Sequence, residues 1–147
     1  MIEVRLISEF PGDMLVRIAG LYISANWISP GDDTSFLYPA LKGSALVAGA
    51  FQDGEIIGIG RAISDGCSDA YIQDVVVSPD HRGQGIGKKM FAHFLARTDK
   101  SHPITVNASD YGVPIYEKLG FSVTDSRKEE NGIVYTPMTY RRERNEQ

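Results

Sequence analysis

Apolar residues alternate with polar ones along several short stretches of the chain and recur every three or four positions along others. Alternation is typical of a β-strand with one buried face, whereas the longer period is typical of an amphipathic helix. Near the start, Ile2, Val4 and Leu6 alternate with Glu3 and Arg5, which predicts a half-buried strand. The expected strands are residues 2–8, 44–52, 55–64, 71–77, 103–107, 121–124 and 133–140. The expected helices are residues 14–27, 35–42, 86–98 and a short segment between Ser109 and Gly120. This order predicts a mixed sheet with helices on its faces.

Turn-forming residues mark where several of these elements end. Asp53 and Gly54 form a tight-turn pair between two strands, which predicts an antiparallel hairpin. In the second strand of this hairpin, Gly58 and Gly60 either admit the close approach of another backbone or a ligand, or accommodate packing or a bulge. Loop 29–34 offers an N-cap for the second helix. Residues 127–132 are expected to form a charged turn before the last strand.

Composition and charge limit the classes of protein to consider. The 147 residues, of which 42% are hydrophobic and 23% charged, are expected to form one domain over residues 1–140, followed by a charged tail over residues 141–147. No apolar run approaches the ~20 residues that span a bilayer, and the N-terminus lacks the pattern of a secretory signal. The single cysteine, Cys67, excludes an internal disulfide and agrees with a cytoplasmic location. A net charge of −4 without a basic stripe makes nucleic acid a poor partner.

The segment from residue 70 to residue 98 carries the clearest functional signal. An apolar strand is followed by a turn, by the glycine-rich sequence Arg82-Gly83-Gln84-Gly85-Ile86-Gly87 and by an amphipathic helix. Glycines at alternate positions let several backbone N–H groups approach one anion, close to the unpaired donors at the start of the helix. The segment therefore predicts a phosphate-binding loop.

The spacing of the glycines separates the known kinds of phosphate loop. A P-loop would need a glycine in place of Arg82 and a Ser or Thr in place of Lys89, and a dinucleotide-binding loop would need a glycine in place of Lys88. The sequence instead matches [Q/R]-x-x-G-x-[G/A], with Arg82, Gly85 and Gly87 at the fixed positions. In this it resembles the acyl-CoA pyrophosphate loop of the GCN5-related N-acetyltransferases (GNAT).

Two further features carry the same resemblance. Residues 77–87 read V-x-P-x-x-R-G-x-G-I-G, and residues 116–121 read Y-E-K-L-G-F, which is the second recurrent signature of the family. Together with the strand order, the resemblance covers roughly residues 44–140. It implies a GNAT-like α/β (α+β) fold, in which a mixed, mostly antiparallel sheet of six to seven strands is flanked by about four helices.

The resemblance implies acetyl-CoA (coenzyme A) as the cofactor. The residues expected to bind it are Val75, Val76, Val77, Arg82, Gly83, Gln84, Gly85, Ile86, Gly87, Lys88, Asn107, Ser109 and Tyr116. In the family, the strand that precedes the loop pairs its backbone with the pantetheine arm, and an N–H near Val75 or Val76 is the expected oxyanion donor. Many relatives also hold this arm with an asparagine about seven residues before the tyrosine of the second signature. Ser109 takes that position here and Asn107 lies two residues earlier, so either is a candidate.

The catalytic candidates are Tyr116 and Asp74. By resemblance, Tyr116 stands beside the sulfur as the general acid, because a phenol with an ordinary pKa near 10 is protonated at neutral pH. The alternative is a core aromatic residue whose hydroxyl caps a backbone group. Asp74 interrupts the apolar row formed by Ile72 and Val76, which makes it a candidate for the general base, for an anchor of the substrate ammonium, or for a hydrogen-bonded structural group.

The acceptor site of the family is built from the first two helices and the turn between the last two strands, here residues 127–132. The matching residues combine aromatic rings with acids, a mixture that holds cationic amines but also occurs in ordinary cores and caps. They are Tyr22, Trp27, Asp32, Asp33, Phe36 and Tyr38. No metal site is expected, because His81, His93 and His102 lack the spacing of metal ligands.

These features together predict an acetyl-CoA-dependent N-acetyltransferase. The expected acceptor is the primary amine of a small molecule, which attacks the thioester directly in a ternary complex. The alternatives are a protein or peptide N-terminal acetyltransferase and a non-catalytic acyl-CoA-binding module. The resemblance is also compatible with a homodimer.

Overall fold

The computed structural model describes residues 1–65, 67, 69–98 and 102–142. Its contacts divide the chain into two compact units. Unit 1 consists of Met1–Ala62 and Asp74–Arg97, and unit 2 consists of Ile63–Gln73 together with the chain from Thr98 onward.

Unit 1 contains the elements of the first half of the chain and the glycine-rich loop. Its strands are β1 (Ile2–Leu6), β2 (Leu46–Gln52), most of β3 (Glu55–Ser64) and the C-terminal half of β4 (Ala70–Val77). Its helices are α1 (Gly12–Ser24), α2 (Leu37–Gly43), the 3-10 helix η1 (Pro79–His81) and α3 (Ile86–Arg97). The antiparallel register of β2 with β3 ends at Gln52↔Glu55, directly before and after Asp53 and Gly54. The predicted hairpin is therefore confirmed.

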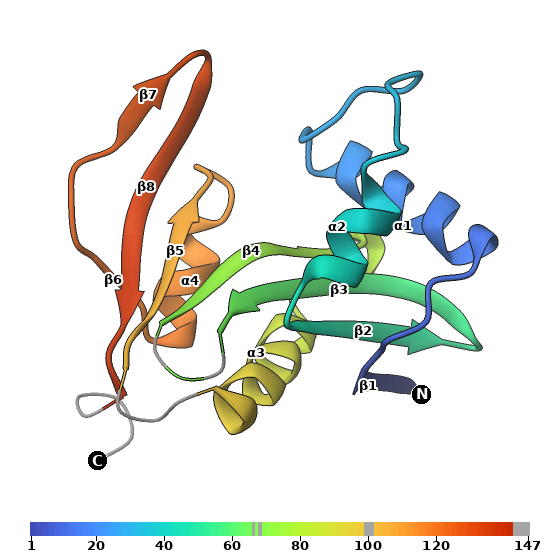
Figure 1. The fold of residues 1–147 in the computed structure, drawn as a ribbon, viewed down its shortest axis with the longest axis horizontal. Coiled ribbons are helices and arrows are strands. Elements are labelled where there is room, and N and C mark those ends of the chain that lie inside the picture. The colour runs from blue at the N-terminus through green and yellow to red at the C-terminus, as the bar shows by residue number, and fades with distance from the viewer. Residues whose placement is uncertain (66, 68, 99–101, 143–147) are drawn as a thin grey trace. The chain divides into compact units, whose positions relative to one another are not determined.

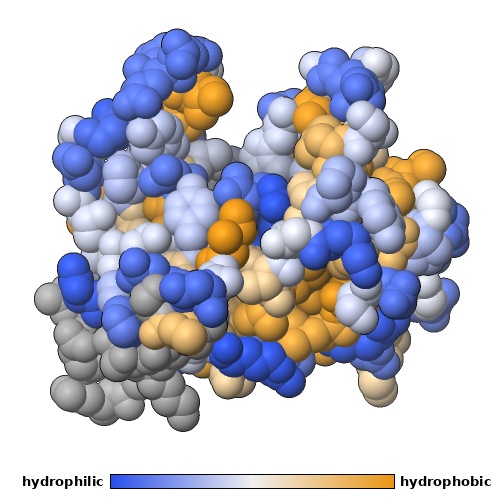
Figure 2. Space-filling model, viewed as in Figure 1, coloured by the Kyte–Doolittle hydropathy of each residue, from blue (hydrophilic) through white to orange (hydrophobic). Residues whose placement is uncertain are grey.

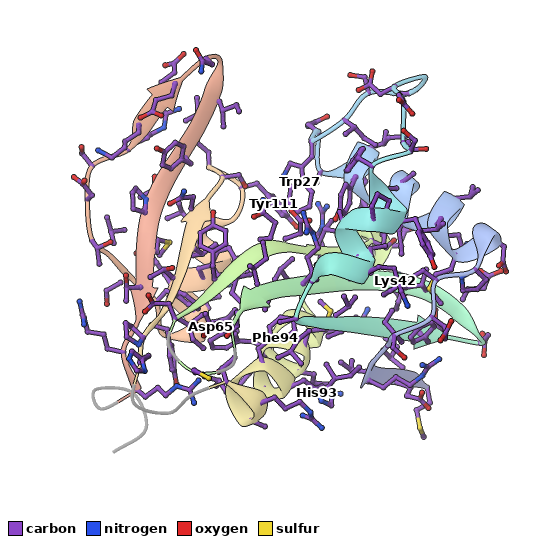
Figure 3. The ribbon with its side chains drawn as sticks, viewed as in Figure 1. Trp27, Lys42, Asp65, His93, Phe94 and Tyr111 are labelled. Atoms are coloured by element: carbon purple, nitrogen blue, oxygen red, sulfur yellow. The ribbon has the colours of Figure 1, made fainter. Side chains whose placement is uncertain are left out.

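Helices cover both faces of the strands in unit 1 (Figure 1). On one face, side chains of α1 and α2 pack on those of β2, β3 and β4. The buried members of this cluster are Phe10, Ile18, Leu21, Tyr22, Leu37, Leu41, Val47, Phe51, Ile56, Ile59 and Val76. On the other face α3 buries Ile86, Met90, Phe91 and Phe94, and Figure 3 shows Phe94 pointing from the helix toward the strands. In Figure 2, apolar side chains accordingly gather over β2 and β3 of this unit.

Gly58 and Gly60 let neighbouring elements approach β3 closely. A Cβ atom added to Gly60 would lie 3.4 Å from the ring of Phe94, and one added to Gly58 would lie 3.3 Å from the carbonyl oxygen of Val76. Gly60 therefore accommodates the packing of α3, whereas Gly58 admits the backbone of β4. Both close contacts are made by the protein itself, which supports the packing interpretation of this glycine pair.

Unit 2 contains the N-terminal half of β4 and the C-terminal elements of the chain. These are β5 (Ile104–Ala108), α4 (Val113–Leu119), β6 (Ser122–Val123), β7 (Lys128–Glu130) and β8 (Ile133–Tyr140). β4 pairs in parallel with β5 from Ala70↔Ile104 to Ile72↔Val106, and β5 pairs antiparallel with β8. Gly120 adopts a left-handed conformation with φ of 106° and ends α4, as the sequence predicted.

Hydrogen-bonded neighbours follow the order β1-β2-β3-β4-β5-β8-β6, and β7 pairs with β8 beside this path. Over the described residues the fold is thus an eight-stranded, mostly antiparallel sheet with four α-helices. The predicted mixed α/β fold class is confirmed. The eighth strand is β7, which lies inside the predicted charged turn of residues 127–132. Asn131 and Gly132, both with positive φ, narrow that turn to two residues, so the charged residues before it can pair with β8.

Three other local predictions were wrong in detail. α1 ends at Ser24 rather than at residue 27, because Asn26 adopts a left-handed conformation with φ of 62°. No side chain of loop 29–34 caps α2, since residue Phe36 occupies the N-cap position without a side-chain hydrogen bond. Arg142, expected in the solvated tail, is only 6% exposed, and its guanidinium donates a hydrogen bond to the Thr98 hydroxyl. Residues 143–147 of the predicted tail lie outside the described residues.

Hydrophilic side chains cover the turn between β7 and β8 (Figure 2). Within the described ranges, no helix is long and apolar enough to cross a membrane.

Candidate active site

The glycine-rich loop leads directly into α3. Gly83 and Gly85 adopt left-handed conformations, with φ of 80° and 76°, which most other residues reach only at a cost. Gly85 also accepts the hydrogen bond of the Lys89 N–H, so it stands at the start of the helix. A Cβ atom added to either glycine would meet no protein atom within 4 Å. The loop therefore presents backbone next to open space at the positive end of a twelve-residue helix, which fits an anion such as a diphosphate.

Arg82, predicted as an extra cation for the phosphate, contacts the backbone of β4. The Arg82 Nε donates to the carbonyl oxygen of Val77 at 3.1 Å, which ties the loop to the end of β4. Gly87 lies within the first turn of α3, where an added Cβ atom would lie 4.0 Å from the Val75 side chain. The loop and the end of β4 are thus held together within unit 1. Gln84 and Lys88 are exposed, and Ile86 is buried.

The two edges of β4 near its C-terminus are distinguished by their hydrogen bonds. The Ser78 N–H donates to the carbonyl oxygen of Ile57 at 2.8 Å, and the Val76 carbonyl oxygen faces Gly58, so these groups point toward β3. Because successive residues of a strand alternate between its edges, the backbone groups of Val75 and Val77 point away from β3. The contact from Arg82 to the Val77 carbonyl agrees with this direction. Of the two predicted oxyanion donors, the N–H of Val75 is therefore the one on the outer edge.

A polar network connects Asp74 on β4 with side chains of α1 and β3 and with the end of α2. Asp74 Oδ2 accepts a hydrogen bond from the Tyr22 hydroxyl at 2.5 Å and another from Arg61 Nε at 2.6 Å. The side chains of Arg61 and Asp74 are each 13% exposed. Arg61 Nη1 also donates to the Ser44 hydroxyl at 3.3 Å, and that hydroxyl donates to the Ala40 carbonyl at 2.7 Å. The network thus joins the end of α2 to both strands and to α1.

The charges of this network depend on one another. Burial raises the pKa of Tyr22 well above its ordinary value, and the negative charge of Asp74 raises it further, so the hydroxyl stays a donor. Burial alone would lower the pKa of Arg61. The attraction to Asp74 and the hydrogen bond between the two side chains outweigh burial, so the pKa of Arg61 is raised. The network therefore consists of a cation, an anion and a neutral phenol.

The predicted acceptor residues divide into two groups. Trp27 packs edge-on against Tyr22, with ring centroids 5.2 Å apart, and so contacts a member of the network around Asp74. Asp32 and Asp33 instead accept hydrogen bonds from backbone N–H groups of their own loop, and the bond from Ser35 lowers the pKa of Asp33. The two remaining aromatic residues, Phe36 and Tyr38, are 42% and 50% exposed. Within the described part of the chain, these four residues form no hydrogen bond or ring contact with the network, so their binding role stays a prediction.

Tyr116, in unit 2, is packed into an aromatic cluster. The residue is 6% exposed, and its ring lies edge-on to Phe121 with centroids 5.2 Å apart. Gly112 permits this position, because an added Cβ atom would come within 3.2 Å of the tyrosine ring. Ser109 Oγ accepts the Gly112 N–H at 3.2 Å and thereby shapes the turn before α4. Asn107 is exposed on β5, and its side chain forms no comparable hydrogen bond with the residues that the structure describes, which favours it over Ser109 for binding an amide.

The predicted acceptor turn is anchored within unit 2. Arg127 donates two hydrogen bonds to the Asp110 carboxylate, of 2.9 Å from Nε and 2.8 Å from Nη2. This contact lowers the pKa of Asp110. The segment leading into β7 is thereby fixed to the loop that precedes α4.

His81 and His93 contact groups that are not among the predicted site residues. His81 Nε2 contacts Gln52 Oε1 at 2.8 Å, and His93 Nε2 lies 3.2 Å from the Val4 carbonyl oxygen. His93 also lines an open groove of about 490 Å³ between β1 and α3, which contains none of the predicted site residues. Among the residues that the structure describes, no group of three or more His, Cys, Asp or Glu side chains is suited to a metal ion. Cys67 is exposed.

Sequence reasoning missed Arg61 and Ser44. A signal for Arg61 was present, because it interrupts the apolar row of Ile57 and Ile59 just as Asp74 interrupts its own row on β4. Two opposite charges on inward-facing positions of neighbouring strands are typical of an ion pair.

Comparison with known proteins places this geometry in a family. The family model described as an acetyltransferase (GNAT) domain matches residues 33–142. The chain belongs to the GNAT family. The resemblance inferred from the two sequence motifs is therefore confirmed, and the acetyltransferases of this fold use acetyl-CoA as their acyl donor.

Curated and solved GNAT proteins resemble the chain over different spans. An uncharacterized N-acetyltransferase, ycf52, of Gracilaria tenuistipitata var. liui is 37% identical over 92 residues, which cover 58% of this chain and 50% of that protein. A glucosamine 6-phosphate N-acetyltransferase of Trypanosoma brucei brucei is 36% identical over 64 residues, covering 42% and 40%. The chain spans about half the length of the curated relatives it matches. A solved aminoglycoside 6'-N-acetyltransferase complexed with coenzyme A shares the fold, with a TM-score of 0.75 at 11% identity over 93% of this chain and 95% of that one.

Proposed function

We propose that this GNAT chain transfers an acetyl group from acetyl-CoA to the primary amine of a small molecule, by direct attack in a ternary complex. The observation that carries the proposal is the glycine-rich loop at the start of α3, held beside the outer edge of β4 within unit 1. This arrangement places an anion site beside the outer backbone edge of β4 in the same unit, which suits a cofactor with a diphosphate and an extended amide arm.

In this proposal the loop and β4 bind different parts of the cofactor. The N–H groups of residues 84–87 would hold the diphosphate, and the Val75 carbonyl oxygen and the Val77 N–H would pair with the pantetheine amides. Bound acetyl-CoA supplies an acetyl group activated as a thioester. The Val75 N–H would then donate to the carbonyl oxygen as that oxygen gains negative charge.

Two side chains complete the proposed chemistry. Tyr116 would supply a proton to the departing sulfur, in accordance with its place in the Y-E-K-L-G-F signature. Asp74 would accept a hydrogen bond from the substrate ammonium. Anchoring fits Asp74 better than base catalysis, because its Oδ2 already accepts two hydrogen bonds, one from the Tyr22 hydroxyl and one from the Arg61 guanidinium. Loss of the ammonium proton is then left to solvent.

Similarity and one aromatic contact support the class of acceptor. One curated relative, glucosamine 6-phosphate N-acetyltransferase, and one structural neighbour, aminoglycoside 6'-N-acetyltransferase, are named for small amines. The aromatic pair Tyr22 and Trp27 beside Asp74 also suits a cationic amine. A homodimer stays a prediction of the family resemblance.

The proposal is tested by measuring CoA release from acetyl-CoA with a panel of acceptors. The panel contains glucosamine 6-phosphate, an aminoglycoside and a short peptide with a free N-terminus, and calorimetry measures acetyl-CoA binding in parallel. We expect acetyl-CoA to bind and CoA release to require a small amine. Release with the peptide alone would favour a protein or peptide N-terminal acetyltransferase, and binding without release would favour a non-catalytic module. Absence of binding would contradict the proposal altogether.

A further inference from the structure

The inward ion pair between Arg61 and Asp74 bears directly on the proposed acceptor site. Each side chain is 13% exposed, so both charges have lost most of their hydration. An apolar pair of similar volume would usually be at least as stable in such a place. Because burying the pair is costly, we infer that the pair serves to hold these side chains in a fixed geometry rather than to stabilise the fold.

Each hydrogen bond of the network has a defined direction. The Ser44 hydroxyl uses its proton on the Ala40 carbonyl and therefore accepts from Arg61 Nη1. Arg61 Nε and the Tyr22 hydroxyl both donate to Asp74 Oδ2. The guanidinium is thus fixed at two points of its plane, on Ser44 and on Asp74, which a lysine ammonium does not reproduce.

This arrangement leaves the other carboxylate oxygen available. Asp74 Oδ1 forms no hydrogen bond within the described part of the chain and keeps contact with solvent. With Oδ2 held by two donors from different elements, the side chain cannot rotate without breaking both bonds. Oδ1 therefore has a fixed direction, and it belongs to the residue directly before Val75, the proposed oxyanion donor.

We propose that Arg61 is a positioning residue for acetyl transfer, which with Tyr22 fixes Asp74 so that Oδ1 receives the acceptor amine beside the Val75 N–H. The assignment rests on the proposed function. Arg61 does not touch the reacting atoms and acts through Asp74. Loss of Arg61 would leave Tyr22 as the remaining donor to Oδ2, so that the carboxylate could turn about this bond. A displacement of about 1 Å at a reacting group typically lowers rates by about 10²-fold.

The test compares Arg61→Met and Arg61→Lys with a matched surface variant, Arg5→Met. Arg5 also pairs with a carboxylate, at 2.7 Å from Glu3, but both side chains are more than half exposed. For each protein, initial rates give kcat and KM for the panel amine with the highest turnover, calorimetry gives the acetyl-CoA Kd, and thermal unfolding gives Tm. We expect both Arg61 variants to lose about 30- to 100-fold in kcat/KM for the amine while the acetyl-CoA Kd changes less than about twofold, and Arg5→Met to match the wild type.

A double variant separates positioning from general structural support. If Arg61 acts through Asp74, Arg61→Met in an Asp74→Asn background should cost less than about threefold more than Asp74→Asn alone. Additive losses, an unchanged kcat/KM in a folded Arg61→Met protein, or a parallel fall in acetyl-CoA affinity would each overturn the assignment. A wild-type protein that acetylates no panel amine would instead overturn the proposed function on which it rests.

Discussion

Substitution of Gly85 by alanine separates the backbone geometry of the glycine-rich loop from its proposed role in binding. Gly85 has φ of 76°, and an added Cβ atom meets no protein atom within 4 Å. The cost to folding is therefore backbone strain alone, about 1–2 kcal/mol for a non-glycine residue in the left-handed region. For a chain of this length each kcal/mol corresponds to a fall in Tm of about 2–4 °C.

The effect on the cofactor is expected to be larger than the effect on folding. The open space next to Gly85 is where the proposed diphosphate would lie, so a methyl group there would displace it from the N–H groups of the loop. Loss of one hydrogen bond to a charged group costs about 1.5–3 kcal/mol, which corresponds to roughly 10- to 100-fold in the acetyl-CoA Kd. Calorimetry measures this Kd directly.

A matched control is available in the same unit. Gly54, in the turn between β2 and β3, has φ of 80° and equally open space for a Cβ atom. Gly54→Ala should therefore lose a similar amount of stability and bind acetyl-CoA as the wild type does. Equal changes in Kd for the two variants, or an unchanged Kd for Gly85→Ala, would refute the placement of the diphosphate.

Three further predictions concern other parts of the molecule. Tyr116→Phe should lower kcat by about 10²-fold with little change in the acetyl-CoA Kd, and an unchanged kcat would remove Tyr116 as the acid. Gly58→Ala should lower the free energy of unfolding more than Gly60→Ala, by about 1 kcal/mol in denaturant titrations. The reason is that a Cβ atom added to Gly58 would lie 3.3 Å from a backbone carbonyl oxygen, whereas one added to Gly60 would lie 3.4 Å from a ring. The reverse order of the two losses would contradict the packing described for β3. Burial raises the pKa of Tyr22 above its unfolded value near 10, so the stability linked to this hydroxyl is complete below pH 10 and is lost as the pH rises further. The free energy of unfolding of Tyr22→Phe should therefore depend less on pH above pH 10 than that of the wild type. Identical pH dependence of the two proteins would count against a protonated Tyr22.

The parts of the fold that depend on neighbouring residues could be predicted from the sequence. The hairpin at Asp53 and Gly54, the end of α4 at Gly120 and the glycine-rich loop all follow from local backbone preferences. For the same reason, the family resemblance carried by residues 77–87 and 116–121 led to the confirmed family.

What could not be predicted depends on contacts between distant residues. Alternation places Val75 and Val76 on opposite edges of β4, but only the pairing with β3 decides which edge each one faces. The partner of Asp74 lies 13 residues earlier in the chain, and its burial depends on how α1 and α2 cover the strands. The burial of Arg142 likewise depends on a distant residue, Thr98. The charged residues around Arg142 in the sequence indicate only a solvated tail.

The most direct test of acetyl transfer follows the acetyl group itself. The protein is incubated with acetyl-CoA that carries an isotopically labelled acetyl group and with each panel amine, and the products are identified by mass spectrometry. We predict that the label appears in an amide on the nitrogen of a small amine, that it requires both the protein and the amine, and that no labelled protein accumulates when the amine is left out. Label found on the protein, on a peptide alone or on no acceptor would contradict direct transfer to a small primary amine.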